Sequence, residues 1–518
     1  MQPEAASSTG VRPHRPGQAP LLVDRIPLSA GVILLLGCGD GALGVEYRRR
    51  NPAAVLIGIE PDPTLAARAS TVLDRVYCLD LATAPLPRFG TAPDCIVFGP
   101  GLVEQLAQPG EVLHDFTRLL APGGVLVLCA PNGAAASGTV GDFAFDAIRQ
   151  LLLAEALHPL SAEPAAAHTI WRAATAPVEP LVILSTMLPP VGGVSVVRVV
   201  EPLHALASEA AVATQVMLPI AQPPQAGPYP SIFILHRPAL LGAGGLEFLR
   251  NLLTRGWLVV CEFDDHPSQI PILHRSDVQN FRAVHAIQTS TTELAAVLAC
   301  ENPEVAVFPN AISRLPDIRN FTTPDRLSVM FAALNREHEW PAHLNALNAA
   351  AAAAGPQLHF HVVADRAFFA ALATPHKSFT PLCDYATYLD ILSRCEVSFM
   401  PLRDTLFNRS KSDLKFLEAA AHRVVALASP VVYGDSITDG VDGVLFHDSA
   451  TLRNRLAQLA ANPAAACAIA DAARAHVVRH RMLAYQVARR TAWYRDLWAR
   501  RDELQRALLA RVPELGPL

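Results

Sequence analysis

A glycine-rich turn near the N-terminus is the first stretch whose residue types could bind a ligand. The segment LLLGCGDGALG, residues 34–44, places Gly37, Gly39 and Gly41 directly after an apolar run typical of a buried strand. Such a turn lets the backbone approach a ligand at the N-terminus of the following helix. The next apolar run, VLIGIE, ends in Glu60, whose carboxylate can accept hydrogen bonds from both hydroxyls of a ribose. These features indicate a ribose-bearing ligand and leave a dinucleotide and S-adenosylmethionine both open.

Charged residues in the last third of the chain could bind an anion. Lys411 stands just before DLKFLEAAA, a segment typical of a buried helix, so its ammonium group and the helix N-terminus would act on one anion. Glu418 follows seven residues later, near the same helix face. Arg336, after the apolar run LSVMFAALN, is the natural second cation. Taken alone, a lysine at a helix start also fits an ordinary solvated charge.

Polar residues also follow two apolar runs in the middle of the chain. His236 and Arg237 end FILHRP, and Asp264 and Asp265 lie in CEFDDHP. The carboxyl ends of parallel strands face the ligand cleft, so His236 is a candidate catalytic residue, with a half-buried structural histidine as the alternative. The aspartate pair fits a helix cap or a salt bridge at least as well as a metal, and we expect no metal site.

Strand-like apolar runs alternate with helix-length segments along nearly the whole chain. This alternation predicts parallel sheets that helices cover on both faces. We therefore predict an α/β protein with three Rossmann-like doubly wound domains, over residues 25–175, 176–320 and 321–483. A polar, proline-rich segment, residues 1–24, is predicted to be a disordered tail, and residues 484–518 have the three-to-four spacing of apolar residues that favours a helix.

Composition excludes several classes of function. The chain has 518 residues, of which 51% are hydrophobic, and a net charge of −5, so it can bury several cores and has no basic surface for nucleic acid. Its nine cysteines form no CxxC pair, which argues against disulfides or a zinc site and favours the cytoplasm. We find no apolar run of the roughly 20 residues that a membrane span requires and no signal peptide. Peripheral contact with a membrane stays open.

The first domain contains further sequence motifs besides its glycine-rich turn. The segments LLLGCGDGALG, GIEPDP, YCLDL and LLAPGGVLVLCAPN together resemble class I S-adenosylmethionine-dependent methyltransferases over nearly the whole domain. The resemblance implies bound S-adenosylmethionine. The residues that it implies are Gly37, Gly39 and Gly41 around the cofactor, Glu60 at its ribose and Asp80 beside its adenine.

The first domain departs from this family at two places. Leu35 stands where relatives have an acidic residue two places before the turn. The stretch GLVEQ replaces a common D-V-L-E-H, so that Gly101 and Gln105 stand for the aspartate and the histidine, and Glu104 alone is kept. An amide does not titrate near neutral pH, so Gln105 cannot act as a general base. Glu104 stays a candidate cofactor-binding residue, and methyl transfer stays open.

The third domain carries a second resemblance. Residues 404–446 look like the donor-binding half of GT-B glycosyltransferases of the family 4 kind. The resemblance implies a nucleoside-diphosphate sugar as donor, with Arg336 and Lys411 on its diphosphate and Glu418 on its ribose. In that family a further glutamate stands eight residues before Glu418, where this chain has Ser410. The sugar therefore stays open, and retention of the anomeric configuration is implied by the family alone.

The second domain supports this pairing. The segment STMLPPVGGVSVVRVVEPLHAL, residues 185–206, resembles the glycine-rich first loop of the acceptor-side domain of such enzymes. The resemblance implies that Gly192 and Gly193 let the backbone approach the transferred sugar, and that His236 orients donor or acceptor. It also implies that the helix over residues 484–518 crosses back to the acceptor-side domain.

Together these observations predict a glycosyltransferase that moves a sugar from a nucleotide sugar to a glycan or glycoconjugate acceptor, fused to a methyltransferase-like domain. Two alternatives stay open. The chain could be bifunctional or chiefly a glycan methyltransferase, with the GT-B half recognising carbohydrate. It could also be a non-catalytic scaffold in glycan assembly.

Overall fold

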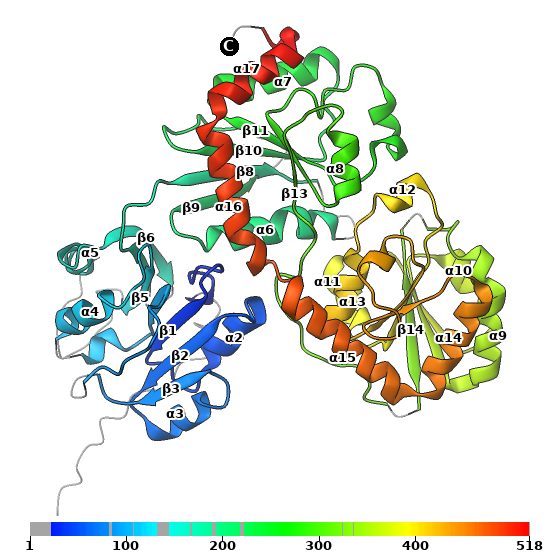
Figure 1. The fold of residues 1–518 in the computed structure, drawn as a ribbon, viewed down its shortest axis with the longest axis horizontal. Helices are drawn as coiled ribbons and strands as arrows, with labels where there is room; N and C mark the ends of the chain where they lie inside the picture. Colours follow the sequence, from blue (N-terminus) through cyan, green and yellow to red (C-terminus); the bar gives the residue numbers. More distant parts are fainter. Residues whose placement is uncertain are drawn as a thin grey trace, which may run out of the picture. The chain divides into compact units, whose positions relative to one another are not determined.

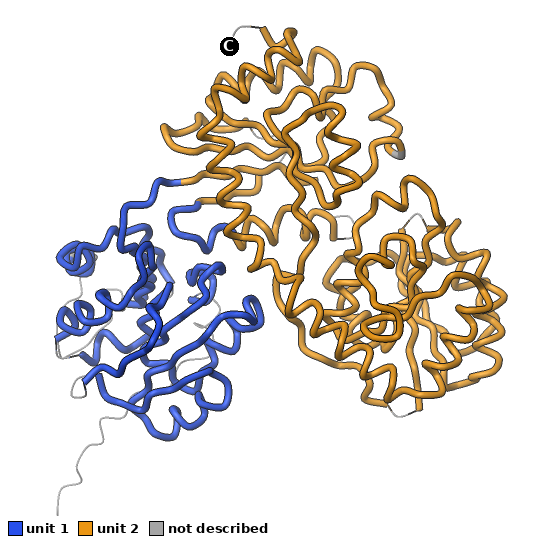
Figure 2. The backbone as a smooth tube through the Cα atoms, viewed as in Figure 1, with its two compact units in different colours: residues 1–180, 206–212 blue, residues 181–205, 213–518 orange. Residues whose placement is uncertain are grey.

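The computed structural model describes most of the chain (Figure 1). The described residues are 22–81, 85–106, 108–131, 145–165, 168–188, 193–217, 222–323, 325–334 and 336–516. Most of the predicted N-terminal tail therefore lies outside them. The chain divides into two compact units: unit 1 holds residues 1–180 and 206–212, and unit 2 holds residues 181–205 and 213–518 (Figure 2).

Unit 1 is built on a sheet of order β3-β2-β1-β4-β5-β7-β6 in its described residues. Its strands are β1 (Val32–Leu36), β2 (Val55–Glu60), β3 (Arg75–Cys78), β4 (Cys95–Phe98), β5 (Val125–Pro131), β6 (His158–Ala165) and β7 (His168–Ala174). Strands β1 to β5 are parallel, and β7 runs antiparallel to both β5 and β6. The helical elements are α2 (Ala42–Arg50), α3 (Pro63–Ala69), η1 (Val103–Gln105), α4 (Pro109–Thr117) and α5 (Phe145–Ala154).

Alternate residues of β1 pack into two different cores. Leu35 packs in the cluster that contains Tyr47 of α2, whereas Leu34 packs in the cluster that contains Phe116 of α4. This is the two-residue period of a strand whose faces are both covered. The continuous apolar run in the sequence therefore corresponds to a strand buried on both sides.

Unit 2 contains two further sheets. The first has the order β13-β12-β11-β10-β8-β9, and the pairs among β8 and β10 to β13 are parallel. Its strands are β8 (Leu181–Thr186), β9 (Val212–Met217), β10 (Ser231–His236), β11 (Leu258–Glu262), β12 (Ala286–Thr289) and β13 (Val305–Val307). The helical elements are η2 (Val196–Val200), α6 (Glu201–Ala207), α7 (Gly242–Thr254), η3 (Pro267–Gln269), η4 (Pro271–His274) and α8 (Thr292–Leu298).

The second sheet of unit 2 is entirely parallel, with the order β16-β15-β14-β17-β18-β19. Its strands are β14 (Leu327–Ala332), β15 (Leu358–Val363), β16 (Lys377–Thr380), β17 (Val397–Met400), β18 (Val425–Ala428) and β19 (Val444–Leu445). The helical elements are η5 (Pro341–His343), α9 (Leu344–Ala354), η6 (Gly355–Gln357), α10 (Arg366–Ala371), α11 (Tyr385–Leu392), α12 (Leu406–Arg409), α13 (Leu414–Ala421), η7 (Tyr433–Asp435), α14 (Ser449–Ala461) and α15 (Pro463–His480). Val329 of β14 packs in the core that contains α9, and Met330 packs in the core that contains α13.

The last helices, α16 (Ala484–Ala499) and α17 (Arg501–Arg511), followed by η8 (Pro513–Leu515), pack on the first sheet of unit 2. The Tyr494 hydroxyl donates to Gln288 Oε1 at 2.6 Å, and Leu508 is buried in the same core as strands β10 and β11. In the described part of the chain, no helix combines the length and apolar character of a membrane span. Three mainly parallel sheets with helices on both faces confirm the predicted fold class.

Candidate functional site

A cavity of about 250 Å³ in unit 2 brings the predicted anion-binding residues together. One side of its lining follows strands β10 and β11 and includes η2. The other side follows β14, β15 and β16 and includes α13. Arg336, Lys411 and Glu418 all line it. In parallel sheets the residues after the carboxyl ends of the strands form the ligand cleft, so this location agrees with a binding site.

Helix α13 begins in this lining without a side-chain cap. Its first residue is preceded by Asp413, which makes no capping hydrogen bond in the described structure. The Asp413 carboxylate instead accepts from both terminal nitrogens of Arg481, at 2.6 and 2.8 Å, and from the Ser436 hydroxyl at 2.6 Å. Helix N-terminal amides that lack a capping side chain can donate to an anion.

Five cationic side chains line the cavity: Arg198 and Arg237, which are held in ion pairs, and Arg336, Lys411 and Lys415. The chain contains only three lysines, and two of them, Lys411 and Lys415, are in this lining. Lys411 Nζ lies 3.7 Å from Asp265 Oδ1, and Lys415 Nζ donates to the Ala332 carbonyl at 2.9 Å. Burial lowers the pKa of Lys411, against the effect of Asp265, and lowers the pKa of Lys415 to about 8. Within the described chain, the Arg336 side chain has no hydrogen bond or ion pair, so it is available to a ligand.

Glu418 lies deep in the same cavity and is held by two tyrosines. The residue is 4% exposed, and its two carboxylate oxygens accept from the Tyr385 hydroxyl at 2.8 Å and the Tyr388 hydroxyl at 2.7 Å. Burial raises the pKa of Glu418, although Lys415 and both hydroxyls act to lower it. Each carboxylate oxygen can accept two hydrogen bonds, so both oxygens can still accept from ribose hydroxyls.

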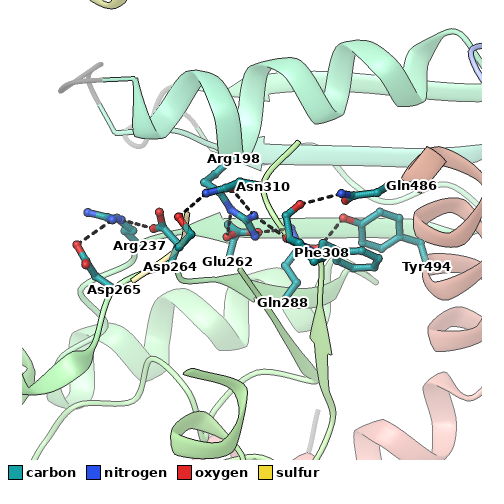
Figure 3. A network of polar contacts seen from close by, with 12 residues as sticks. Arg198, Arg237, Glu262, Asp264, Asp265, Gln288, Phe308, Asn310, Gln486 and Tyr494 are labelled. Carbon is teal, nitrogen blue, oxygen red and sulfur yellow. Dashed lines mark hydrogen bonds and ion pairs between the residues drawn. The ribbon is translucent and has the colours of Figure 1, made fainter. Parts of the chain in front are cut away.

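A buried ion pair supports the other side of the cavity (Figure 3). Arg198 of η2 donates to Glu262 at 2.9 and 3.1 Å, to the Phe308 carbonyl at 2.7 Å and to Asn310 Oδ1 at 2.9 Å. The Asn310 amide in turn donates to the Ser412 hydroxyl at 2.7 Å. Ser412 directly follows Lys411, so this chain of bonds links the buried pair to the cation that lines the cavity.

The predicted aspartates hold an arginine. Arg237 donates to Asp264 at 2.6 Å and to Asp265 at 3.0 Å (Figure 3). Burial would raise the pKa of Asp264, but Arg237 holds it below its ordinary value. Asp264 and Asp265 therefore form a salt bridge, which is one of the two structural roles expected for them from the sequence.

His236 lies next to this group, although it is absent from the cavity lining. It ends β10, is 2% exposed, and neither ring nitrogen has a hydrogen-bond partner among the described residues. Burial lowers the pKa of His236 to about 4, so the ring is neutral at physiological pH. The following residue, Arg237, is the one that reaches the cavity.

Gly193 makes a close approach in unit 2. Its φ is 91°, and a Cβ atom there would lie 2.4 Å from a ring carbon of Tyr385, which holds Glu418. Only glycine fits both the backbone conformation and this contact. Gly192, the other predicted glycine, lies outside the described residues.

The predicted cofactor residues of unit 1 gather at the carboxyl edge of its sheet. Gly37, Gly39 and Gly41 have φ values of 63°, 58° and 87° in the turn between β1 and α2. Glu60 ends β2, is 2% exposed, and accepts from the Gly39 amide at 2.8 Å and the Asp62 amide at 3.2 Å. The turn and the carboxylate are thus joined, and the remaining acceptor capacity of Glu60 fits a ribose.

The other predicted residues of unit 1 follow strands at this edge. Asp80 follows β3, and Glu104 lies in η1 after β4, where its Oε1 is 3.5 Å from His168 Nε2. Leu35 is buried in the core, as an apolar side chain requires, and it supplies no charge near the turn. The Gln105 amide donates to the Gly101 carbonyl at 2.6 Å, which closes the loop locally.

Several residues of the cavity in unit 2 were not predicted from the sequence. Lys415 could have been found, because it stands four residues after Lys411 and three before Glu418, on the same helical face. Tyr385 and Tyr388 have helical spacing but lie 33 and 30 residues before Glu418, and Arg198 lies 64 residues before its partner Glu262. No sequence signal pairs groups at such separations.

Comparison with known proteins agrees with both resemblances. A family model described as Glycosyl transferase-like matches residues 339–490. The N-terminal region is similar to trans-aconitate 2-methyltransferases, with 31% identity over 170 residues to the Methylobacterium radiotolerans protein and 30% over 115 residues to the Azoarcus sp. protein. These matches cover 30% and 21% of this chain and 65% and 44% of the relatives, less than two thirds of their own length in each case.

Among solved structures, the Anabaena protein HepE in complex with UDP-glucose is similar, with 14% identity, 60% of this chain and 99% of that chain covered, and a TM-score of 0.43. The family match and the curated relatives confirm the two resemblances expected from the sequence.

Proposed function

We propose that this chain, which joins a methyltransferase-like N-terminal region to a glycosyltransferase-like domain, transfers a sugar from a nucleoside-diphosphate donor to a glycan or glycoconjugate acceptor. The observation that carries the proposal is the convergence of Arg336, Lys411 and Glu418 on one cavity of unit 2. Their types match the parts of such a donor, because cations bind a diphosphate and a buried carboxylate binds a ribose.

The charges of the cavity suit the chemistry of the transfer. The bond between the anomeric carbon and the diphosphate breaks, a bond to an acceptor oxygen forms, and the proton of the acceptor hydroxyl passes to an oxygen of the leaving diphosphate or to solvent. Negative charge therefore builds up on the leaving diphosphate. Arg336, Lys411 and the N-terminal amides of α13 would stabilise that charge, and Lys415 adds a third cation beside Glu418.

Because the chain has only three lysines, donor binding can be tested directly by chemical modification of lysine. Lys377 lies outside the lining and donates to the Phe369 and Leu372 carbonyls, so it serves as an internal reference. We expect a bound nucleoside diphosphate to slow reductive methylation of Lys411 and Lys415 at least fivefold and to leave Lys377 unchanged. Mass spectrometry of the modified peptides measures this, with UDP, GDP, ADP, CDP and dTDP tested in turn. Equal modification with every nucleotide at millimolar concentration would contradict the proposal.

For unit 1 we propose binding of S-adenosylmethionine. The turn of Gly37, Gly39 and Gly41 and the Glu60 carboxylate fit the ribose and backbone contacts that this cofactor requires, and the curated relatives are methyltransferases. When bound, the cofactor supplies a methyl group as an electrophile. Leu35 and Gln105 supply neither the acid nor the base of relatives, so the proposal for unit 1 is binding of the cofactor.

Calorimetric titration of the full chain with S-adenosylmethionine tests this binding. We expect saturable heat in the wild type and its loss in Gly39→Val, because the added side chain occupies the turn whose amide contacts Glu60. The matched control is Gly123→Val, at a positive-φ glycine with no atom within 4 Å of its Cβ position, which should retain the heat. Absence of heat in the wild type at saturating ligand would show that unit 1 is structural.

A further inference from the structure

A second cavity of unit 2, with a volume of about 600 Å³, meets the first at two residues. Lys411 and Ser412 line both cavities. The rest of its lining comes from the segments that follow β12 and β13 and from loops after β17 and β18. Neither the sequence motifs nor the proposed donor site accounts for this space.

The lining of the second cavity is polar and carries little free positive charge. In the described chain, five of the lining side chains bear hydroxyls, four bear carboxylates, and two are cations. Arg409 is paired with Asp404 through two bonds, and Lys411 lies beside Asp265. Glu293 and Asp435 pair with no cation among the described residues. An anionic ligand would meet these carboxylates, whereas a neutral, hydroxyl-rich ligand could both donate to them and accept from the hydroxyls.

Ser290 gives an independent sign that a polar ligand belongs here. It follows β12, is 3% exposed, lines the cavity, and its hydroxyl has no hydrogen-bond partner among the described residues. A buried hydroxyl without a partner is energetically unfavourable, and native proteins seldom keep one without a reason. Val432, another lining residue, has φ 70°, a strained conformation for a β-branched residue of the kind that is concentrated at ligand sites.

We infer that this second cavity binds the acceptor, as an uncharged sugar residue with several free hydroxyls. The inference rests on the proposed function, because Lys411 and Ser412 would then lie between the donor diphosphate in the first cavity and the acceptor in the second. An acceptor placed there is next to the donor site and remains separate from the nucleotide-binding residues. Ser290 is a specificity-determining residue in this arrangement, because rotation about its Cα–Cβ bond brings the buried hydroxyl from its unpaired position to the ligand.

Saturation-transfer NMR on the full chain tests the inference with named probes. The probes are the methyl glycosides of glucose, galactose and mannose and methyl glucuronoside, each at millimolar concentration, with the donor site filled by the nucleoside diphosphate that protects the lysines. We expect signals from at least one neutral glycoside and at least fivefold weaker signals from the glucuronoside. No neutral signal, or an equal signal from the glucuronoside, would overturn the inference.

Two tryptophan variants of α8 locate the binding. Thr292 lines the cavity, so Thr292→Trp should abolish the neutral-glycoside signal, whereas Ala296→Trp, at an exposed position of the same helix outside the lining, should keep it. Equal loss or equal retention in both variants would contradict the placement. Lysine protection by the nucleotide is measured on the same samples, so a failed donor site is recognised separately from a failed acceptor cavity.

Ser290→Ala separates binding from folding. If the hydroxyl serves a ligand, its removal weakens glycoside binding severalfold while the free energy of unfolding is unchanged or rises, because an unpaired buried group is lost. If the hydroxyl has a structural bond instead, the variant loses stability and keeps its affinity, and the inference fails.

Discussion

At the scale of single residues, Glu201 is a carboxyl group whose titration is coupled to Glu418 of the cavity in unit 2. Glu201, the first residue of α6, accepts from the Ser313 hydroxyl at 2.7 Å and also interacts electrostatically with Glu418. Burial, with a contribution from Glu418, raises the pKa of Glu201 to about 7, although Ser313 acts to lower it. The protonation of Glu201 is therefore coupled to the charge of Glu418, the proposed ribose-binding residue.

This raised pKa predicts a pH dependence of stability. The folded chain holds the Glu201 proton above pH 4.5, where the unfolded chain has lost it, so the contribution of Glu201 to the free energy of unfolding falls as the pH rises from about 4.5 to about 7. The expected fall in this contribution, read as the difference between the wild type and Glu201→Gln, is on the order of 2 kcal/mol after allowance for partial exposure. Urea unfolding of the wild type and of Glu201→Gln measures it, and the variant should lack this fall.

Glu247→Gln is the matched control, because this exposed carboxyl of α7 has no ion pair or hydrogen bond within the described chain. It should follow the wild-type profile. If Glu201→Gln also followed that profile, the raised pKa of Glu201 would be refuted.

At the scale of elements, Gly193 and helix α11 determine how the Glu418 carboxylate is held. Gly193 touches the ring of Tyr385, and Tyr385 bonds to Glu418. In Gly193→Ala, the new Cβ would lie 2.4 Å from that ring and the backbone would be strained at φ 91°, at a cost of about 1–3 kcal/mol. We expect Tyr385 to be displaced and the affinity for nucleoside diphosphate, measured by calorimetry, to fall about tenfold.

Gly244→Ala supplies the comparison, because no atom lies within 4 Å of its Cβ position in helix α7. Alanine favours a helix over glycine, so this variant should keep the nucleotide affinity and be as stable as the wild type or slightly more so. Equal affinities in Gly193→Ala and the wild type would show that the contact with Tyr385 has no part in nucleotide binding.

The sequence was most informative about the secondary-structure elements and their arrangement into sheets. Apolar runs such as VILLL in β1 are buried on both faces, so their composition alone indicated parallel sheets. The direction in which a single side chain points was harder to predict from the sequence. Both His236 and Arg237 were expected at the cleft; Arg237 lines the cavity and His236 does not, because successive residues at the end of a strand face different sides.

At the scale of the whole molecule, the order of residues along the chain does not reveal which segments share a unit. Residues 206–212 lie within the sequence of unit 2 but belong to unit 1. There, the Arg172 guanidinium donates to the carbonyls of Ala207, Ser208 and Glu209, and the Ser29 hydroxyl donates to Glu209 across 180 positions. The domain boundary expected between residues 175 and 176 rested on local sequence patterns, which carry no information about such distant bonds.

The two units also differ in how completely their sites could be predicted. In unit 1 the glycine turn and Glu60 are close in sequence and are joined by one hydrogen bond. In unit 2 the cations were predicted from local patterns, whereas the tyrosines, Arg198 and the second cavity arise from tertiary packing between separate elements. Local sequence patterns therefore predicted the cations of the cavity, whereas tertiary packing determined which residues hold and surround them.

The most direct test of the account is turnover of a nucleotide sugar by the full chain, with the donor whose nucleotide best protects the lysines. We expect release of nucleoside diphosphate by the wild type and a loss of about 100-fold or more in kcat/KM in Lys411→Ala, because one charge on the leaving diphosphate is left unstabilised. Arg453→Ala, at an exposed position of α14 outside both cavities, should retain wild-type turnover. Turnover by folded Lys411→Ala equal to that of the wild type would contradict the assignment of unit 2 as the glycosyl-transferring part of the protein.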